Sequence, residues 1–196
     1  VYNLTSKYNS AAQSKLVNTG TIDKFSNRWG VKDITYLGAK YLCPVVDKKT
    51  FVSNFGKAYI RKTLSKKLIF KGLNLLDGFI DLSGNYIPGK STLVICSDDI
   101  NNLKFLCGLL NSKLAIFYIK SKYASSSYCG GITFSKDMIN NFPVSSLTGF
   151  KEKVISIVDK ILDSGYSINL NKLLNDTIYS SYNLSSAERR IIEQSI

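Results

Sequence analysis

The sequence predicts an α+β protein, with a mainly antiparallel sheet flanked by helices and a C-terminal helical appendage. Short runs rich in Ile, Val, Phe and Tyr, separated by Gly, Pro, Asn and Ser, are typical of strands and occur before residue 98. Apolar residues three and four positions apart, which are typical of helices, dominate after it. With 196 residues, 44% of them hydrophobic, the chain is long enough to bury a core. We expect one domain over 1–146 and a helical segment over 147–196.

Four strands are expected after a first stretch of 50 residues that looks irregular. Residues 57–63 (KAYIRKT) alternate only in part, which favours a half-exposed strand that turns its basic side chains outward. The runs 67–72, 77–82 and 91–97 are richer in apolar and β-branched residues. Because Gly, Pro and Asn separate these runs, the region predicts antiparallel hairpins.

The helical half begins at Asp98-Asp99, where either aspartate can cap a helix that runs to about Leu110. Asn111-Ser112 offers a break and a new cap before a second, strongly apolar helix over 113–122. Both helices should pack against the sheet, because their apolar residues repeat at helical spacing.

A loop rich in Ser and Gly is expected over 123–131, exposed as such loops usually are. A short strand over 132–134 and a short helix opened by Ser135 follow, and Asn141-Phe142-Pro143 ends that helix. After Leu147 everything looks helical and charge-neutral.

Three helices are predicted in this last part. The first, over 150–163, has one apolar face and Gly165 as its C-cap. The second covers 169–182. Ser185 and Glu188 form a capping box before the third.

Positive charge is concentrated in the first part of the chain. The formal net charge is +12; residues 1–150 hold 20 Lys and Arg against 8 Asp and Glu, and residues 151–196 hold 6 against 6. No acidic residue lies between Lys48 and Leu76. The positive electrostatic field of such a segment attracts phosphate backbones. The alternative is a solvated basic face in a Lys-rich proteome, which the heavy use of Asn, Lys, Ile and Tyr also fits.

Several chemistries are excluded by composition. Histidine is absent, which removes histidine triads and histidine-zinc sites. The four cysteines (Cys43, Cys96, Cys107 and Cys129) stand singly, so neither a zinc site nor a disulfide framework is predicted. No nucleotide-binding glycine signature is present. No apolar run approaches the roughly 20 residues of a membrane span and no signal peptide is visible, so we expect a cytoplasmic protein without a membrane partner.

One pattern suggests a nuclease. Asp33 followed by Asp47-Lys48-Lys49 matches the acids and lysine with which metal-dependent nucleases hold magnesium and activate water. Such triplets arise by chance in any Lys-rich chain. We therefore predict no catalytic centre, and a metal-dependent nuclease stays as an alternative.

The order of three segments resembles a known family. They are NTGTIDKFSNRWG (18–30), KLIFKGLNLLDGFIDLSGNYIPGKSTLVI (67–95) and LKFLCGLLNSKLAIFYIKSKYASSSYCGGITFSKDMINNFPV (103–144). Over about residues 15 to 145 the chain resembles the TaqI-like C-terminal specificity domain of adenine-specific DNA methyltransferases and of type IIG restriction-modification enzymes. Its most specific piece runs from the Leu110-Asn111-Ser112 junction to Phe142-Pro143. Target recognition domains of type I specificity subunits show a similar order.

This resemblance implies a domain that reads a short sequence in double-stranded DNA and presents the target adenine to a separate catalytic domain upstream. Methylation with S-adenosylmethionine and any magnesium-dependent cleavage would belong to that catalytic part. The resemblance thus implies that this chain is not itself an enzyme and holds no cofactor.

Two groups of residues are predicted to contact DNA. Phosphate contacts are expected from Lys48, Lys49, Arg61, Lys62, Lys66, Lys67 and Lys71. Base readout is expected from two loops, over 19–32 and 120–136, through Thr19, Thr21, Arg28, Trp29, Lys32, Ser125, Ser126, Ser127, Tyr128 and Lys136. Lys120 and Lys122 are expected to act as phosphate clamps at the boundary of the Ser/Gly loop.

Two alternatives remain open at this point. In the first loop, Trp29 could anchor the loop to the core while Asp23 pairs with Lys24 or Arg28. The whole chain could also be a protein-interaction module that docks through its helical tail; such a module would show no DNA affinity at low salt.

Overall fold

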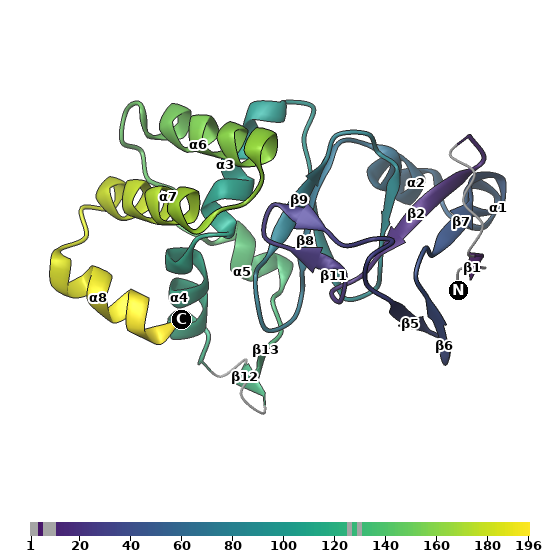
Figure 1. Cartoon of the computed structure of the whole chain (residues 1–196), viewed down its shortest axis with the longest axis horizontal. Coiled ribbons are helices and arrows are strands. Elements are labelled where there is room, and N and C mark those ends of the chain that lie inside the picture. The colour runs from purple at the N-terminus through teal and green to yellow at the C-terminus, as the bar shows by residue number, and fades with distance from the viewer. Residues whose placement is uncertain (1–3, 6–10, 125–126, 129–130) are drawn as a thin grey trace.

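The computed structural model describes residues 4–5, 11–124, 127–128 and 131–196. Figure 1 shows a long molecule with β2, β7 and two short helices at one end and helices α6, α7 and α8 at the other. The predicted α+β class is confirmed, since helices combine with small, mainly antiparallel sheets. Within the described part, every helix is too short or too polar to cross a membrane.

A four-stranded sheet forms the N-terminal end. Its strands, in spatial order, are β1 (Leu4–Thr5), β7 (Val45–Asp47), β2 (Gln13–Val17) and β10 (Tyr86–Pro88). β10 pairs with β2 in parallel, and the other pairings are antiparallel. The prediction that the first 50 residues are irregular is wrong, because β2 pairs with strands far along the chain and no local pattern reveals them.

Two helices, α1 (Lys48–Asn54) and α2 (Lys57–Leu64), pack against β7 and β10 respectively. The strand predicted for KAYIRKT is wrong, because this segment forms most of α2. Ile60 and Leu64, four residues apart, both pack on the apolar cluster around Phe51. The segment therefore forms a helix and not a strand, because its apolar residues follow helical spacing and alternate only in part.

Two small antiparallel hairpins lie between β2 and β7 in the chain. They are β3 (Ile22–Asp23) with β4 (Ser26–Asn27), and β5 (Ile34–Tyr36) with β6 (Ala39–Tyr41). Leu37 and Gly38 form the tip of the second hairpin with φ of 50° and 81°. Two positive φ angles are what a tight two-residue hairpin turn requires.

A three-stranded antiparallel sheet lies in the middle, in the order β11 (Thr92–Cys96), β8 (Lys67–Lys71) and β9 (Gly78–Asp81). The predictions of strands over 67–72, 77–82 and 91–97 are therefore confirmed to within two residues at each end. Gly78 is required in β9, because a Cβ there would lie 2.5 Å from the Cβ of Phe70 on β8.

Helices α3 (Ile100–Leu110) and α4 (Lys113–Lys122) confirm the predicted pair. Asp99 caps α3 and Ser112 caps α4, each by accepting backbone N–H bonds. Between them the buried amide of Asn111 accepts from the Gly78 N–H (2.9 Å) and donates to the Gly78 carbonyl (3.0 Å). These two bonds fix the helix junction on β9.

The segment after α4 contains strands β12 (Ser127–Tyr128) and β13 (Gly131–Ile132), followed by α5 (Lys136–Asn140). The predicted loop over 123–131 therefore includes a small hairpin. The predicted strand over 132–134 is confirmed in part: β13 ends at Ile132, but Thr133 forms an isolated antiparallel bridge with Leu73, and the Phe134 N–H donates to the Gly72 carbonyl (2.9 Å). Ser135 caps α5 as predicted.

Helices α6 (Phe150–Ser164), α7 (Ile168–Ser181) and α8 (Ser186–Ser195) confirm the predicted C-terminal helices, including the capping box at Ser185 and the left-handed φ of Gly165. The α6 helix lies against α3, where a Cβ on Gly108 would come within 2.6 Å of Val154. One apolar cluster joins α3, α4 and the C-terminal helices. The boundary between 146 and 147 stays a prediction.

Candidate nucleic-acid interface

The loop NTGTIDKFSNRWG is held together mostly by its own polar groups. Thr21 is fully buried; its Oγ1 donates to the Asn18 carbonyl (3.1 Å) and accepts from the Asn18 N–H (3.2 Å). The prediction that Thr21 contacts DNA is therefore wrong, because its hydroxyl closes a turn inside the loop. Thr19 is half-buried, and its predicted contact stays a prediction.

Trp29 anchors this loop, as the structural alternative expected. Its Nε1 donates to the Pro44 carbonyl (2.9 Å), and the Nζ of Lys15 lies 4.5 Å from the ring centroid. The ring packs on the cluster of Val17 and Ile22. The anchoring reading is therefore confirmed, while Trp29 is half-buried and its predicted base contact stays a prediction.

Arg28 pairs with Asp23, with 3.7 Å between Nη1 and Oδ2. This confirms the ion pair expected by the alternative reading of the loop. The Arg28 side chain is still 53% exposed. Lys32 is exposed as well, so DNA contact by Arg28 and Lys32 stays a prediction.

Lys67 and Lys71 correct the predicted phosphate contacts. The Lys67 side chain has no exposed surface, and its Nζ lies 2.6 Å from Asp81 Oδ2. Burial lowers the pKa of Lys67, and the Asp81 charge opposes that shift. The Nζ of Lys71 lies 2.7 Å from Asp77 and 4.0 Å from Asp23. Both predictions are wrong, because these ammonium groups neutralise carboxylates within the fold.

The remaining predicted cations differ in exposure. Lys48 and Lys120 are half-buried. Lys122 is exposed and donates to Tyr118 Oη (2.9 Å), a bond that raises the pKa of Lys122. The other exposed ones, which make no ion pair with any described residue, are Lys32, Lys49, Arg61, Lys62, Lys66 and Lys136.

Four predicted residues lie on the Ser/Gly loop. Ser125 and Ser126 lie outside the described residues, as does Cys129. Ser127 and Tyr128 form β12, paired with β13. Their predicted DNA contacts stay predictions.

A cavity of about 1000 Å³ collects residues from six separate segments. Its walls come from the end of β2, the β5–β6 hairpin, α2 with Phe55 before it, Phe70 of β8, the stretch from Pro88 to Ile95 of β11, and α5. Among the described residues, three lysines line it, Lys62, Lys90 and Lys136, and no carboxylate does. We call this side of the molecule the cavity face.

The α2 helix presents only part of its charge to this cavity. Tyr59, Lys62 and Thr63 line the cavity, and these positions share one side of a helix. Lys57 and Arg61 are exposed but line no part of the cavity, and helical geometry turns them to the other side. Neighbouring cations on α2 therefore differ in direction.

The β5–β6 hairpin adds a further cation. Lys40 lies directly opposite Thr35, which lines the cavity, and residues directly opposite in a hairpin point to the same face. Lys40 is exposed. The cavity face thus carries Lys40 beside its three lining lysines.

Of the predicted contact residues that the structure describes, two line the cavity, Lys62 and Lys136. Sequence reasoning missed Lys40, Lys90 and Tyr59. If KAYIRKT had been read as a helix, its spacing would have placed Tyr59 beside Lys62. Lys40 and Lys90 sit in turns and hairpins whose position depends on tertiary packing, so no sequence signal marks them.

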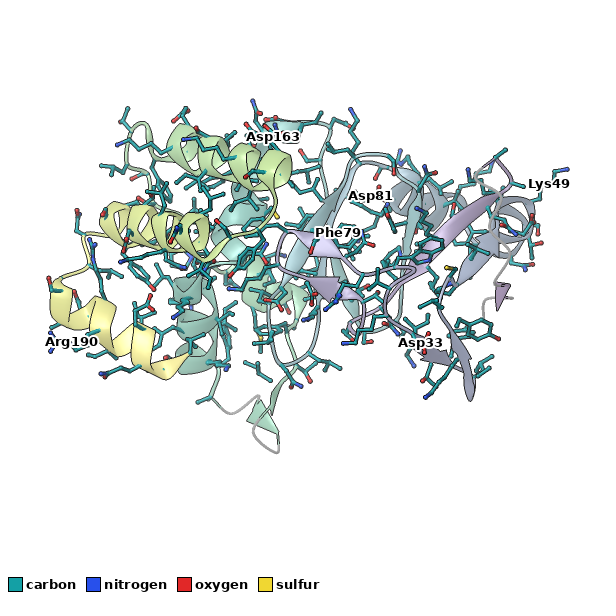
Figure 2. All side chains as sticks on the ribbon, viewed as in Figure 1. Asp33, Lys49, Phe79, Asp81, Asp163 and Arg190 are labelled. Carbon is teal, nitrogen blue, oxygen red and sulfur yellow. The ribbon has the colours of Figure 1, made fainter. Side chains whose placement is uncertain are left out.

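The nuclease alternative lacks a common centre. Asp47 caps α1 by accepting from the Thr50 N–H and hydroxyl (2.8 and 2.9 Å), and the N–H bond in particular lowers the pKa of Asp47. Figure 2 shows Asp33 and Lys49 at separate places on the N-terminal end. Across the described ranges, no group of three Asp, Glu, Cys or His side chains is placed to hold a metal ion.

Comparison with known proteins gives no family assignment. Neither a scan against protein-family models nor a search of curated proteins finds a match for this chain. The likeness to TaqI-like domains therefore stays a prediction. The functional assignment depends on the charge and geometry of the cavity face.

Proposed function

We propose that this chain is a DNA-binding recognition module and that the cavity face is where it meets double-stranded DNA. In the fuller form of the proposal, it is the target recognition part of an adenine-specific methyltransferase or a type IIG restriction-modification enzyme. The sequence resemblance supports that fuller form, and the distribution of charge supports the coarser one.

One observation carries the proposal: Lys62, Lys90 and Lys136 converge from segments far apart in sequence, with no carboxylate among the lining residues that the structure describes. Like charges gathered without counterions repel one another and destabilise the folded state. A polyanion that neutralises them gains both the direct attraction and the entropy of released counterions. Phosphate backbones have the matching charge.

In this proposal, chemistry on DNA belongs to a catalytic domain outside these 196 residues. That domain would bind S-adenosylmethionine for methylation and magnesium for any cleavage. The described residues offer no cluster of three acidic side chains for magnesium, so no catalytic step is assigned to this chain.

Fluorescence anisotropy of a labelled random-sequence duplex, titrated with this chain at about 50 and 200 mM salt, tests the proposal. We expect binding at the lower salt that weakens by orders of magnitude at the higher one, because phosphate contacts release counterions. Absence of binding at both salts would contradict it.

A protein-interaction module is the second candidate, and one feature favours it. A largely apolar cleft of about 480 Å³ lies between α4 and α8, lined by Leu114, Phe117 and Ile191 among others. Ile191 is 55% exposed. If the duplex does not bind at low salt, this candidate takes first place. The cleft is equally compatible with contact to a catalytic domain in the first proposal.

A further inference from the structure

The strand β11 forms one edge of the central sheet, and its outer side lies along the cavity. Among the described strands, β8 is its one partner in that sheet. Every residue of β11 is half-buried or exposed. Four consecutive positions, 92–95, line the cavity. Because successive side chains of a strand point to opposite faces, a cavity that all four reach runs along the edge of the strand.

The pairing register shows which backbone groups of β11 point outward. The Lys71 N–H donates to the Asp77 carbonyl (2.8 Å), so Lys71 bonds toward β9. The direction alternates along an antiparallel strand, so the residues of β8 on either side of each such position bond toward β11, where their partners include Leu93 and Ile95. The N–H and carbonyl of Val94 therefore point away from β8, and among the described residues no backbone group bonds to them.

Free edges of this kind are normally blocked in proteins, by charged residues, proline, bulges or a covering element. The sequence of β11, TLVIC, contains neither a charge nor a proline. The α2 helix reaches its far end, where Cys96 Sγ lies 3.5 Å from the Lys62 carbonyl oxygen. Val94, in the middle of the strand, lines the cavity instead. The edge of β11 is therefore open to pairing with one further strand.

The cavity also contains a buried hydroxyl that lacks a partner. Thr63 of α2 lines the cavity and is 1% exposed, and its Oγ1 forms no hydrogen bond with any described residue. An unsatisfied buried hydroxyl destabilises the folded protein, and a polar ligand beside it removes that cost. The free edge and this hydroxyl together indicate a ligand that carries hydrogen-bonding groups along its length.

Charge distinguishes between two ligands that could supply a strand. A second copy of this chain, paired edge to edge through β11, would bring two sets of Lys62, Lys90 and Lys136 together, and like charges repel. A peptide with carboxylates would instead neutralise these lysines. Leu93 and Ile139 also line the cavity, so apolar side chains between the carboxylates have surfaces on which to pack.

We propose that an extended acidic peptide of a partner protein enters the cavity and pairs with β11 as a fourth strand of the central sheet. Backbone bonds to Val94 align the peptide, and its carboxylates pair with the cavity lysines. Addition of a strand to a sheet edge is a general mode of peptide recognition. The inference goes beyond the proposed function, and because the two ligands share the lysines, the peptide and a DNA duplex exclude one another.

The first test is the fluorescence anisotropy of a labelled peptide in which glutamate and valine alternate, titrated with the wild-type chain at about 50 mM salt. The peptide is about seven residues long, enough to span the five residues of β11. Its control carries lysine in place of glutamate. We expect the acidic peptide to bind at least about tenfold more tightly, because like charges at an interface are strongly unfavourable.

Equal affinities, or no binding of either peptide, would overturn the inference. This titration contains no DNA, so its failure is separate from a failure of duplex binding, which would overturn the proposed function alone.

Amide hydrogen exchange followed by NMR locates the peptide on the strand. The Val94 amide faces the cavity, whereas the Leu93 and Ile95 amides bond to β8. Saturating acidic peptide should slow exchange at Val94 by at least about tenfold and change the other two much less. Unchanged exchange at Val94, or equal slowing at all three amides, would overturn strand pairing even if the peptide binds.

Two double variants test the role of the lysines. Lys62→Ala with Lys136→Ala should weaken the acidic peptide by about fivefold or more, because two ion pairs are lost. Lys153→Ala with Lys160→Ala removes the same charge from exposed positions on α6 and should leave the affinity unchanged. Equal losses in the two variants would contradict binding in the cavity.

Size-exclusion chromatography of the free chain tests the other occupant. We expect a monomer, because the cavity lysines of two copies repel one another. A dimer in which the Val94 amide is already protected from exchange would assign the edge of β11 to a second copy and overturn the inference.

Discussion

The central sheet and the cavity face both contain lysines, and they use them differently. On β8, Lys67 and Lys71 each lie within hydrogen-bonding distance of an aspartate, Asp81 and Asp77. On the cavity face, Lys62, Lys90 and Lys136 line one space, and none of the described residues around that space is a carboxylate. The basic segment 48–71 looks uniform in sequence, but its charges are divided between fold stability and a surface that still needs counterions.

This difference teaches that the role of a lysine depends on whether a carboxylate lies beside it, and not on how many lysines the segment contains. Asp81 also accepts bonds from the Ser83 N–H and hydroxyl and from the Tyr86 N–H, so it fixes the turn after β9 as well as Lys67. Figure 2 places Asp81 in the middle of the molecule. Lys67 and Lys71 are not among the described residues that line the cavity, so the charges of the two regions can be removed separately.

The largest expected effect is the loss of stability in Lys67→Ala. The substitution leaves the Asp81 carboxylate buried without its main counterion, which costs about 3–5 kcal/mol when one partner of a buried pair is removed. Urea unfolding followed by circular dichroism measures the change.

Its neighbour Lys66 is the matched control. Lys66 is exposed and makes no ion pair within the described residues, so Lys66→Ala should change the free energy of unfolding by no more than about 0.5 kcal/mol. Equal destabilisation by the two substitutions would contradict the division between paired and unpaired lysines.

A smaller effect separates the two sides of α2. Lys62→Ala should weaken binding to duplexes of every sequence and lower the slope of log affinity against log salt by about one unit, as loss of one phosphate contact does. Arg61→Ala removes the same charge from the other side of α2 and should change the slope by much less. Equal salt slopes for the two variants would contradict a DNA interface at the cavity.

The smallest effect concerns cysteine chemistry and changes neither fold nor binding. Cys107 is fully buried, and burial raises the pKa of its thiol to about 12. Cys96 is exposed on β11. Iodoacetamide at mildly alkaline pH should therefore modify Cys96 in the native protein and Cys107 only after unfolding, as peptide mass spectrometry would detect. Native modification of Cys107 at a similar rate would contradict a sealed core behind β9.

The sequence predicted the parts of the fold that depend on local signals. Asp99 and Ser112 cap helices because their side chains reach amides two or three residues away, and Gly165 ends α6 through its own φ. The sequence does not predict β2, because the strands that pair with it are distant along the chain. It predicts a strand in place of α2, because Ile60 and Leu64 contact the cluster around Phe51 only in the folded chain.

The sequence predicted the kind of ligand for the candidate site but not the residues that form it. Net charge pointed to a polyanion, but burial of Lys67 depends on Asp81, fourteen residues away on a neighbouring strand. The meeting of Lys62, Lys90 and Lys136 depends on how α2, β11 and α5 pack around one cavity. No local sequence pattern predicts either the burial of Lys67 or the convergence of these three lysines.

The most direct test of the central claim compares two triple variants by anisotropy of a labelled duplex at about 50 and 200 mM salt. One removes the cavity-face lysines by Lys62→Ala, Lys90→Ala and Lys136→Ala. The other removes three exposed lysines of α6 and α7 by Lys153→Ala, Lys160→Ala and Lys172→Ala, with the same loss of charge. We expect the first to lose most of its affinity and about two to three units of salt slope, and the second to bind nearly as the wild type does. Equal losses would mean that net charge alone drives binding, and would contradict a DNA interface on the cavity face.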